Sequence, residues 1–342
     1  IATLARSRGL DFVALSEHNT SSHLSLLASA QARHPELLFV PSVEFTTYKG
    51  HANGFGATAY VDHKLGIAGH SIAAVQEAFA QQGALFTINH PVLDLGDSCI
   101  GCAWEHPPSA SNVAAVEIAT GGWSQGGFLF TENAIAFWDR LCARGVHAAA
   151  VGGSDDHRAG TGTGPTHSPI GDPTTLVFAK DLSIASLIEG IRNGRTVVKL
   201  QGPGDPMVTL DAEGRRERDT MVGEAFKLKV VVTGGAGRQV RLVHNGKARP
   251  PVAVDADPFT LEVDATAPEG GQDRWRAEVL VDDHPRTVTS HLWLARTWPD
   301  DPPPAPPAEP ASCGCTHAPA PLLLAPLAIA GLLFAARARR RR

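Results

Sequence analysis

The sequence predicts an α/β fold, a distorted TIM-like βα barrel of about seven strands, followed by a small all-β sandwich. Over roughly the first 200 residues, short apolar runs alternate with segments of helical spacing. The runs are apolar on both faces, as in parallel strands covered by helices. Polar residues follow the runs directly, where barrel enzymes carry their chemistry. No G-x-G-x-x-G motif is present to favour an open, doubly wound sheet.

Composition places the chain among ordinary globular proteins. Its 342 residues suffice for one large core and a smaller domain, and 43% of them are hydrophobic. A net charge of −5 gives no basic surface that would argue for nucleic-acid binding. Most of the 15 histidines lie in the N-terminal two-thirds, which points to metal or proton chemistry there.

The start of the chain predicts a strand upstream of Ile1, and the cysteine spacing predicts a loop disulfide. Residues 1–9 are typical of the last turns of a helix stopped by Gly9, so we expect a first strand and any signal peptide upstream of Ile1. Cys99 and Cys102 form a single C-x-x-C motif, and without a second motif a zinc ribbon is disfavoured. In an exported protein a loop disulfide is favoured over a free thiol pair.

The elements of the barrel region follow from apolar runs, helical spacing and glycine stops. The expected strands and closing segment are 11–16, 37–43, 51–56, 84–88, 113–118, 147–152, 174–178 and 195–200. The expected helices are 22–33, 71–82, 131–144 and 183–192, with Ser71 as an N-cap.

Beyond residue 202 the helical spacing gives way to alternating runs at 226–232, 240–243, 259–263 and 275–281. Asn245-Gly246 is a hairpin turn between two of them. The predicted domains are a barrel at 1–202, an antiparallel sandwich at 205–298, a Pro-rich linker at 299–311 and a tail at 312–342.

The tail combines Cys313 and Cys315 with an apolar run at 319–336 and an arginine-rich end. The run is long enough for one transmembrane helix, and the arginines would stay cytoplasmic, so the domains would face outward. A buried core helix is the alternative. The tail resembles the C-terminal sorting signal of myxobacterial surface proteins, which implies a sorting protease and display at the cell surface. An ordinary C-terminal membrane anchor stays open.

Metal-ligating side chains recur at the ends of the predicted strands. Asp155 and His157 follow one strand, and i and i+2 point the same way in an extended backbone. The other strand-end side chains are His18, Glu44 and His90, and His51 comes soon after Glu44. A lone histidine at a strand end is usually structural, but several together indicate a site for zinc, manganese or iron.

Four motifs together resemble the polymerase-and-histidinol-phosphatase (PHP) metallohydrolase superfamily. They are residues 15–20 (LSEHNT), 43–53 (VEFTTYKGHAN), 89–91 (NHP) and 153–157 (GSDDH). The Gly-His-x-Asn element and the β region are similar to its carbaryl-hydrolase-like branch. The resemblance implies a βα barrel with two or three divalent ions, bridged by Glu44. It makes His18, His90, Asp155 and His157 terminal ligands, and His51 either a ligand or a support for one.

The resemblance has two departures. Glu17 stands where the family has Asp before the histidine, and the family's His-x-His motif should precede Ile1. The chain is therefore expected to be truncated at its N-terminus. Glu17 and Asn19 would then support the ligands rather than bind metal.

The implied activity is metal-dependent hydrolysis of a small-molecule substrate. Clustered divalent ions would lower the pKa of a bound water and hold the resulting hydroxide for attack on phosphorus or on a carbonyl carbon. Arg158 and Asn53 are the candidate substrate-binding residues, although Arg158 could equally be a surface arginine. A phosphoesterase is the leading interpretation. A carbamate, ester or amide hydrolase and a non-catalytic surface binding module are the alternatives.

Overall fold

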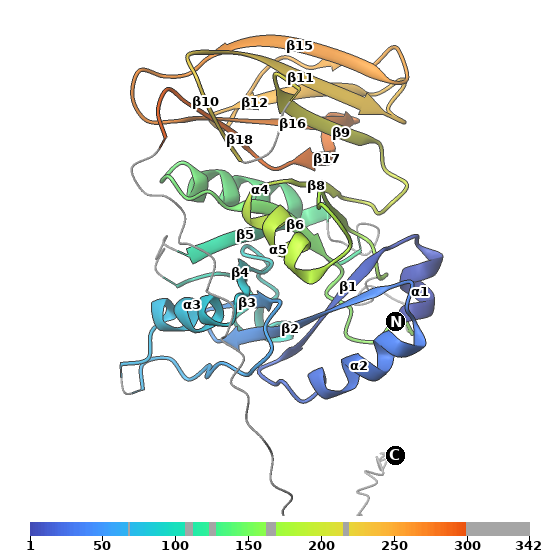
Figure 1. Cartoon of the computed structure of the whole chain (residues 1–342), viewed down its shortest axis with the longest axis vertical. Coiled ribbons are helices and arrows are strands. Elements are labelled where there is room, and N and C mark those ends of the chain that lie inside the picture. Colours follow the sequence, from blue (N-terminus) through green and yellow to red (C-terminus); the bar gives the residue numbers. More distant parts are fainter. Residues whose placement is uncertain (68, 107–111, 123–127, 162–168, 215–218, 299–342) are drawn as a thin grey trace, which may run out of the picture. The chain divides into compact units, whose positions relative to one another are not determined.

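Six strands from the N-terminal half of the chain form one mixed sheet that curls into a half-barrel (Figure 1). The structure is a computed structural model, and it describes residues 1–67, 69–106, 112–122, 128–161, 169–214 and 219–298. The strands lie in the order β1-β2-β3-β4-β5-β6. Their bounds are β1 Phe12–His18, β2 Leu38–Thr47, β3 Gly50–Phe55, β4 Leu85–Ile88, β5 Val113–Thr120 and β6 Ala149–Gly153.

The prediction of a parallel sheet is wrong at β3. The pairs β1–β2, β4–β5 and β5–β6 are parallel, but β3 runs antiparallel to both β2 and β4. Between Thr47 and Gly50 only Tyr48 and Lys49 remain, and so short a link can join only antiparallel strands. Gly50 suits this turn because its φ of 138° is in a range that side chains disfavour.

The last two strands expected in the barrel join a different sheet. β7 (Thr174–Val177) pairs antiparallel with β8 (Thr196–Lys199), and β8 pairs with β17 (His284–Thr289). Side-chain hydrogen bonds, rather than backbone pairing, connect β7 and β8 to β6. The Thr175 hydroxyl accepts from the Gly152 N–H and donates to the Gly152 carbonyl, and the Thr196 hydroxyl donates to the Ala150 carbonyl. The described residues thus form a six-stranded half-barrel rather than the closed seven-stranded barrel that we expected.

The predicted helices are confirmed, with small shifts at their ends. They are α1 Ala2–Ser7, α2 Leu24–Arg33, α3 Ile72–Gln81, α4 Phe128–Cys142 and α5 Ile184–Arg192. Ser71 and Ser183 are the N-caps of α3 and α5, and each hydroxyl accepts a backbone N–H from the first turn. The core beneath the sheet includes Phe79 of α3 and Trp138 of α4.

The last third of the described chain, from Met207 onward, consists of β-strands in two packed sheets. One is the antiparallel sheet β15-β11-β9, and the other runs β10-β18-β16-β17-β8-β7 with β12 beside β16. Leu228 and Trp275 belong to the apolar core that the two sheets share. The bounds are β9 Met207–Ala212, β10 Thr220–Val222, β11 Ala225–Thr233, β12 Gln239–His244, β13 Lys247–Ala248, β14 Val252–Ala253, β15 Phe259–Thr266, β16 Asp273–Val281 and β18 Leu292–Ala295.

The hairpin predicted at Asn245-Gly246 is confirmed, since both residues have positive φ and His244 pairs with Lys247 across the turn. Among the described helices, none is both long and apolar enough for a bilayer crossing. The linker and tail predicted at 299–342, with the apolar run 319–336, lie outside the described residues.

Candidate metal centre

A buried carboxylate on β2 is the centre of the site. Glu44 is only 5% exposed, and three imidazole rings surround it. Its Oε2 lies 3.4 Å from His18 Nδ1, and its Oε1 lies 3.2 Å from His51 Nδ1 and 3.7 Å from His90 Nε2. Asn89 Nδ2 also donates to Oε1 at 3.2 Å. Three of the predicted residues, His18, His51 and His90, therefore meet around a fourth, Glu44.

Strand pairing explains why these residues meet. In the parallel β1–β2 ladder His18 lies opposite Glu44, because both strands end at the same edge. The β2–β3 hairpin returns the chain so that His51 faces Thr46, two residues from Glu44. His90 follows β4, and its φ of 26° marks a sharp change of chain direction.

Asp155 and His157 reach the same region from the end of β6. His157 Nε2 lies 3.0 Å from His18 Nε2, and Asp155 Oδ1 lies 3.7 Å from His157 Nδ1. The backbone is not extended here as we expected, because β6 ends at Gly153 and Asp155 has a φ of 52°. A turn rather than strand alternation brings the two side chains together. Two imidazole nitrogens so close require a shared proton or a cation.

Two overlapping groups of side chains could hold metal ions. His18, Glu44 and His51 form one group, and His51, His90 and Cys102 form the other, with the ligand atoms of each group within 4.8 Å of one another. His51 belongs to both. Its Nε2 is buried and has no hydrogen-bond partner among the described residues, as expected of an atom that binds an ion. The predicted loop disulfide forms, so the Cys102 sulfur is bonded to Cys99.

Glu117 is a residue of the site that sequence reasoning missed. It lies on β5, is 8% exposed, and its Oε2 accepts a hydrogen bond from the His90 backbone N–H at 2.7 Å. Burial raises its pKa to about 8, and the nearby Asp155 adds to the effect although His90 opposes it. Glu117 could have been identified as a carboxylate inside an otherwise apolar strand, whereas the predicted ligands all came from strand ends or the hairpin after β2.

The electrostatics favour a bound cation. Burial disfavours ionised Glu44, but hydrogen bonds from His51 and His90 outweigh it and hold the pKa of Glu44 well below its usual range. Burial likewise opposes charge on His90, yet Glu44 and the neighbouring carboxylates raise its pKa to about 9. Burial and Glu44 raise the pKa of Asp155. Carboxylates that repel one another in a buried place are stabilised by a cation between them.

The remaining predicted residues lie near the site in different roles. Asn19 links the end of β1 to β2 by two hydrogen bonds of 2.9 Å. Its side-chain amide donates to the Thr46 carbonyl and accepts from the Thr46 N–H. Thr46 Oγ1 in turn lies 2.5 Å from His18 Nδ1. Glu17 and Arg158 are exposed, and Asn53 carries a buried Oδ1 without a hydrogen-bond partner among the described residues. Their proposed roles stay predictions.

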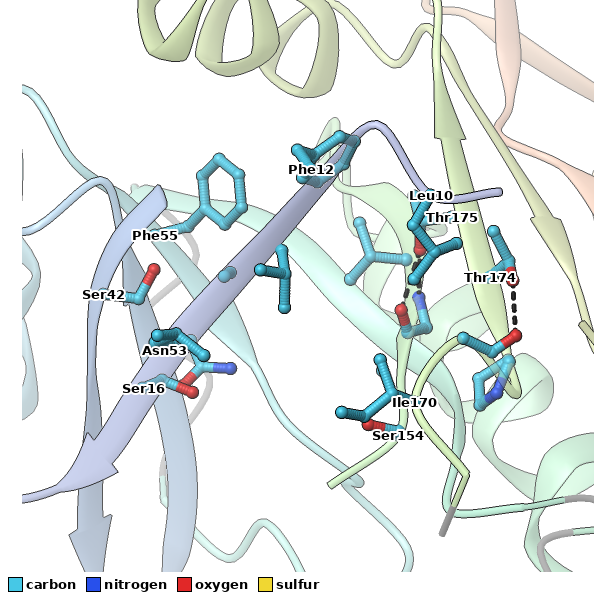
Figure 2. Close-up of a pocket in the computed structure, with 18 of the residues that line it drawn as sticks. Leu10, Phe12, Ser16, Ser42, Asn53, Phe55, Ser154, Ile170, Thr174 and Thr175 are labelled. Carbon is cyan, nitrogen blue, oxygen red and sulfur yellow. Dashed lines mark hydrogen bonds between the residues drawn. The ribbon is translucent and has the colours of Figure 1, made fainter. Parts of the chain in front are cut away.

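A cavity of about 1130 Å³ opens beside the centre. Figure 2 shows part of its wall, with Phe12 and Ser16 from β1 facing Ile170 and Thr175 across the space. The site residues that line it are His18, Glu44, Asn53, His90, Glu117, Asp155, His157 and Arg158. His51 contacts Glu44 but does not line the cavity. One side of the site is therefore open to the cavity, and the side that carries His51 is closed to it.

Comparisons with known proteins give no family assignment. No protein-family model matches the sequence, and no curated protein matches it. The solution NMR structure of the CARDB domain of PF1109 from Pyrococcus furiosus is 20% identical, covering 27% of this chain and 98% of that chain with a TM-score of 0.21. A crystal structure of the same domain in complex with di-metal ions is 19% identical, covering 27% of this chain and 96% of that chain with a TM-score of 0.19.

Proposed function

We propose that this chain is a metal-dependent hydrolase of the PHP type, and that its substrate is a phosphoester. The observation that carries the proposal is the buried Glu44 carboxylate with His18, His51 and His90 around it. Buried carboxylates usually pair with one cationic partner, whereas three converging imidazoles are typical of a metal site.

The donor set fits two or three divalent ions such as zinc, manganese or iron. Imidazole nitrogens and carboxylate oxygens suit these borderline ions, and the unpaired Nε2 of His51 leaves a buried donor atom for one of them. When bound, such ions supply an activated water and neutralise charge on the reacting group. Glu44 would bridge, and His18, His90, Asp155 and His157 would be terminal ligands.

The chain's own residues orient the ligands and the substrate. Asn89 holds Oε1 of Glu44, and Glu117 holds the His90 backbone, so both ligands are fixed before an ion binds. Asn53 and Arg158 line the cavity and would bind the polar end of a substrate. An arginine suits the anionic oxygens of a phosphoester.

A carbamate, ester or amide hydrolase is the second candidate. It is favoured by the apolar part of the cavity wall, which includes Phe12, Phe55 and Ile170. Such a wall suits an uncharged, partly aromatic substrate better than a small phosphate monoester.

The chain is further proposed to be exported and held at the cell surface by its tail, where a sorting protease processes the Cys313–Cys315 region. A disulfide between Cys99 and Cys102 is typical of an oxidising compartment and supports this location. Membrane fractionation of cells that express the chain with and without residues 312–342 tests it.

The test of function is hydrolysis of phosphomonoesters, phosphodiesters and carbamates with added manganese, zinc or iron. Glu44→Gln keeps the shape of the side chain and removes its negative charge. Turnover should fall by roughly 100-fold or more, which exceeds the loss expected when a residue that only supports a ligand is replaced. Asp155→Ala and His90→Ala should abolish turnover. Glu36→Gln, an exposed carboxylate beside Arg6, is the matched control. Metal-independent turnover, or turnover unchanged in Glu44→Gln, would contradict the proposal.

A further inference from the structure

The loop that carries the Cys99–Cys102 disulfide is attached directly to the metal centre. The Cys102 carbonyl oxygen lies 3.1 Å from His90 Nδ1 and accepts a hydrogen bond from it. The loop is also fixed on both sides, because Trp104 N–H donates to the Pro91 carbonyl and Glu105 N–H donates to the Lys49 carbonyl. These bonds do not involve the sulfur atoms, so reduction of the disulfide breaks none of them.

The Cys102 sulfur itself lies among potential ligands. It is within 4.8 Å of ligand atoms of His51 and His90, and all three residues are buried. Cys102 is 1% exposed, and the Nε2 atom of His51 lacks a hydrogen-bond partner among the described residues. A disulfide sulfur is a poor metal ligand, whereas a thiolate is among the strongest for zinc and iron.

We propose that the Cys99–Cys102 disulfide is a redox gate on the metal centre. Reduction releases Cys102 as a thiolate that joins His51 and His90 in holding one divalent ion. In the oxidised state Cys102 contributes only its carbonyl, which orients His90. The proposal rests on the proposed function insofar as that function supplies a metal at these histidines.

With a dithiol as the reductant, the reduction proceeds by thiol–disulfide exchange. One reductant thiolate attacks the sulfur of Cys99, which is more exposed than Cys102, and the Cys99–Cys102 bond breaks with Cys102 leaving as a thiolate. The second reductant thiol then displaces Cys99 from the mixed disulfide. Two electrons reach the protein and the reductant becomes a disulfide. Cys99 takes the proton of the second thiol, the proton of the first thiol goes to solvent when it forms the attacking thiolate, and Cys102 stays a thiolate bound to the ion.

The gate would alter which metal the site prefers. The oxidised centre offers nitrogen and oxygen donors, which manganese accepts as readily as zinc does. The reduced centre adds a soft thiolate, which favours zinc and iron over manganese. Reduction is thus expected to lower the dissociation constant for zinc and to leave that for manganese nearly unchanged.

Cobalt absorption spectroscopy on the full chain tests the gate, because only a coordinated thiolate gives cobalt a strong near-ultraviolet charge-transfer band. A phosphine is the reductant, since it becomes a phosphine oxide by taking oxygen from water and adds no thiol ligand. The oxidised wild type should bind cobalt without the band, and reduction should produce it. Cys99→Ser should show the band without any reductant.

Cys102→Ser is the matched control, and it should bind cobalt without the band in either state. Cys142, Cys313 and Cys315 remain in every variant, so under reducing conditions the difference between wild type and Cys102→Ser reports Cys102 alone. Failure of the band to appear in either the reduced wild type or Cys99→Ser overturns the gate while leaving the metal centre intact. Absence of bound cobalt from every variant, measured by equilibrium dialysis, would instead remove the proposed function itself.

Discussion

At the scale of the single residue, Glu117 shows how burial changes the charge of a side chain at the candidate metal centre. Its raised pKa of about 8 keeps most of the carboxyl protonated at neutral pH, although it accepts a hydrogen bond from His90. A divalent ion nearby would favour the ionised form. The same side chain is therefore nearly neutral in the metal-free protein and would be charged with a divalent ion bound beside it.

Glu117→Gln is expected to separate these two states. Glutamine keeps the size of the side chain and an oxygen that accepts the His90 N–H, so thermal stability of the metal-free protein should change little. Metal affinity should fall by roughly 10–100-fold, because the charge that supports the His90 ligand is lost. Isothermal titration with zinc and a thermal melt measure the two effects. Glu105→Gln, an exposed carboxylate on the disulfide loop, is the control, and equal affinity in both variants would contradict this role.

Metal affinity should also depend on pH in a recognisable range. A proton must leave each ligand before it binds an ion, so protons compete below the ligand's pKa. For the ligand His90 that pKa is raised to about 9, and the supporting Glu117 must lose a proton as well, because its pKa is raised to about 8. The apparent affinity should therefore keep rising above neutral pH instead of levelling off near the ordinary histidine value. Titrations from pH 6 to 9 in a non-chelating buffer check this, and a plateau already at pH 7 would contradict it.

Site residues that follow an apolar run could be predicted from the sequence, whereas site residues inside such a run were harder to recognise. His18, Glu44, His90, Asp155 and His157 could be proposed because strand ends of a sheet gather at one edge. Glu117 could not, because its position beside His90 depends on the register of β5, which no local pattern encodes.

At the scale of the element, the β2–β3 hairpin is the part on which the site depends. It carries Glu44, His51 and Asn53, and its turn reverses the chain in two residues. Gly50 is required there, because a Cβ would lie 2.5 Å from the Trp104 ring as well as at an unfavourable φ. The helices were predictable from spacing and caps, whereas the direction of β3 depended on loop length.

Gly50→Ala compared with Gly145→Ala isolates that close contact. Both residues have positive φ, but nothing lies within 4 Å of a Cβ built at Gly145. Each substitution should cost roughly 1–3 kcal/mol of backbone strain, and Gly50→Ala should cost about 1–3 kcal/mol more through the clash. Urea unfolding measures the free energies, and metal titration should show weaker binding for Gly50→Ala alone. Equal losses in both variants would mean that Trp104 does not constrain the hairpin.

At the scale of the whole molecule, buried charges connect the half-barrel with the β16-containing sheet. Asp139 of α4 accepts a 2.7 Å hydrogen bond from the Arg276 guanidinium of β16, and its other carboxylate oxygen lies 3.3 Å from His291 Nε2. Glu278, which is fully buried, accepts from both Arg241 and Arg276. These pairs were invisible in the sequence, as was the pairing of β8 with β17, because both depend on segments far apart in the chain.

His291 should make the stability of this connection depend on pH. Burial lowers its pKa to about 3, so the unfolded chain takes up a proton below its ordinary pKa of 6.5 while the folded chain does not. The free energy of unfolding should therefore decline as pH falls from 6.5 toward 3, with a contribution of about 1.4 kcal/mol per pH unit. Urea unfolding at several pH values should show a smaller slope for His291→Gln. His63→Gln, at a partly exposed histidine in a loop, is the control, and slopes equal to wild type in both variants would contradict this contribution.

The central claim is that Glu44, His18, His51 and His90 hold a divalent metal. The most direct measurement is an anomalous difference map from crystals of the full chain soaked in manganese and collected near the manganese edge. A strong peak between the Glu44 carboxylate and the imidazole rings, lost in Glu44→Gln crystals, is the result that we predict. A map without a peak there, or peaks at surface carboxylates alone, would contradict the claim.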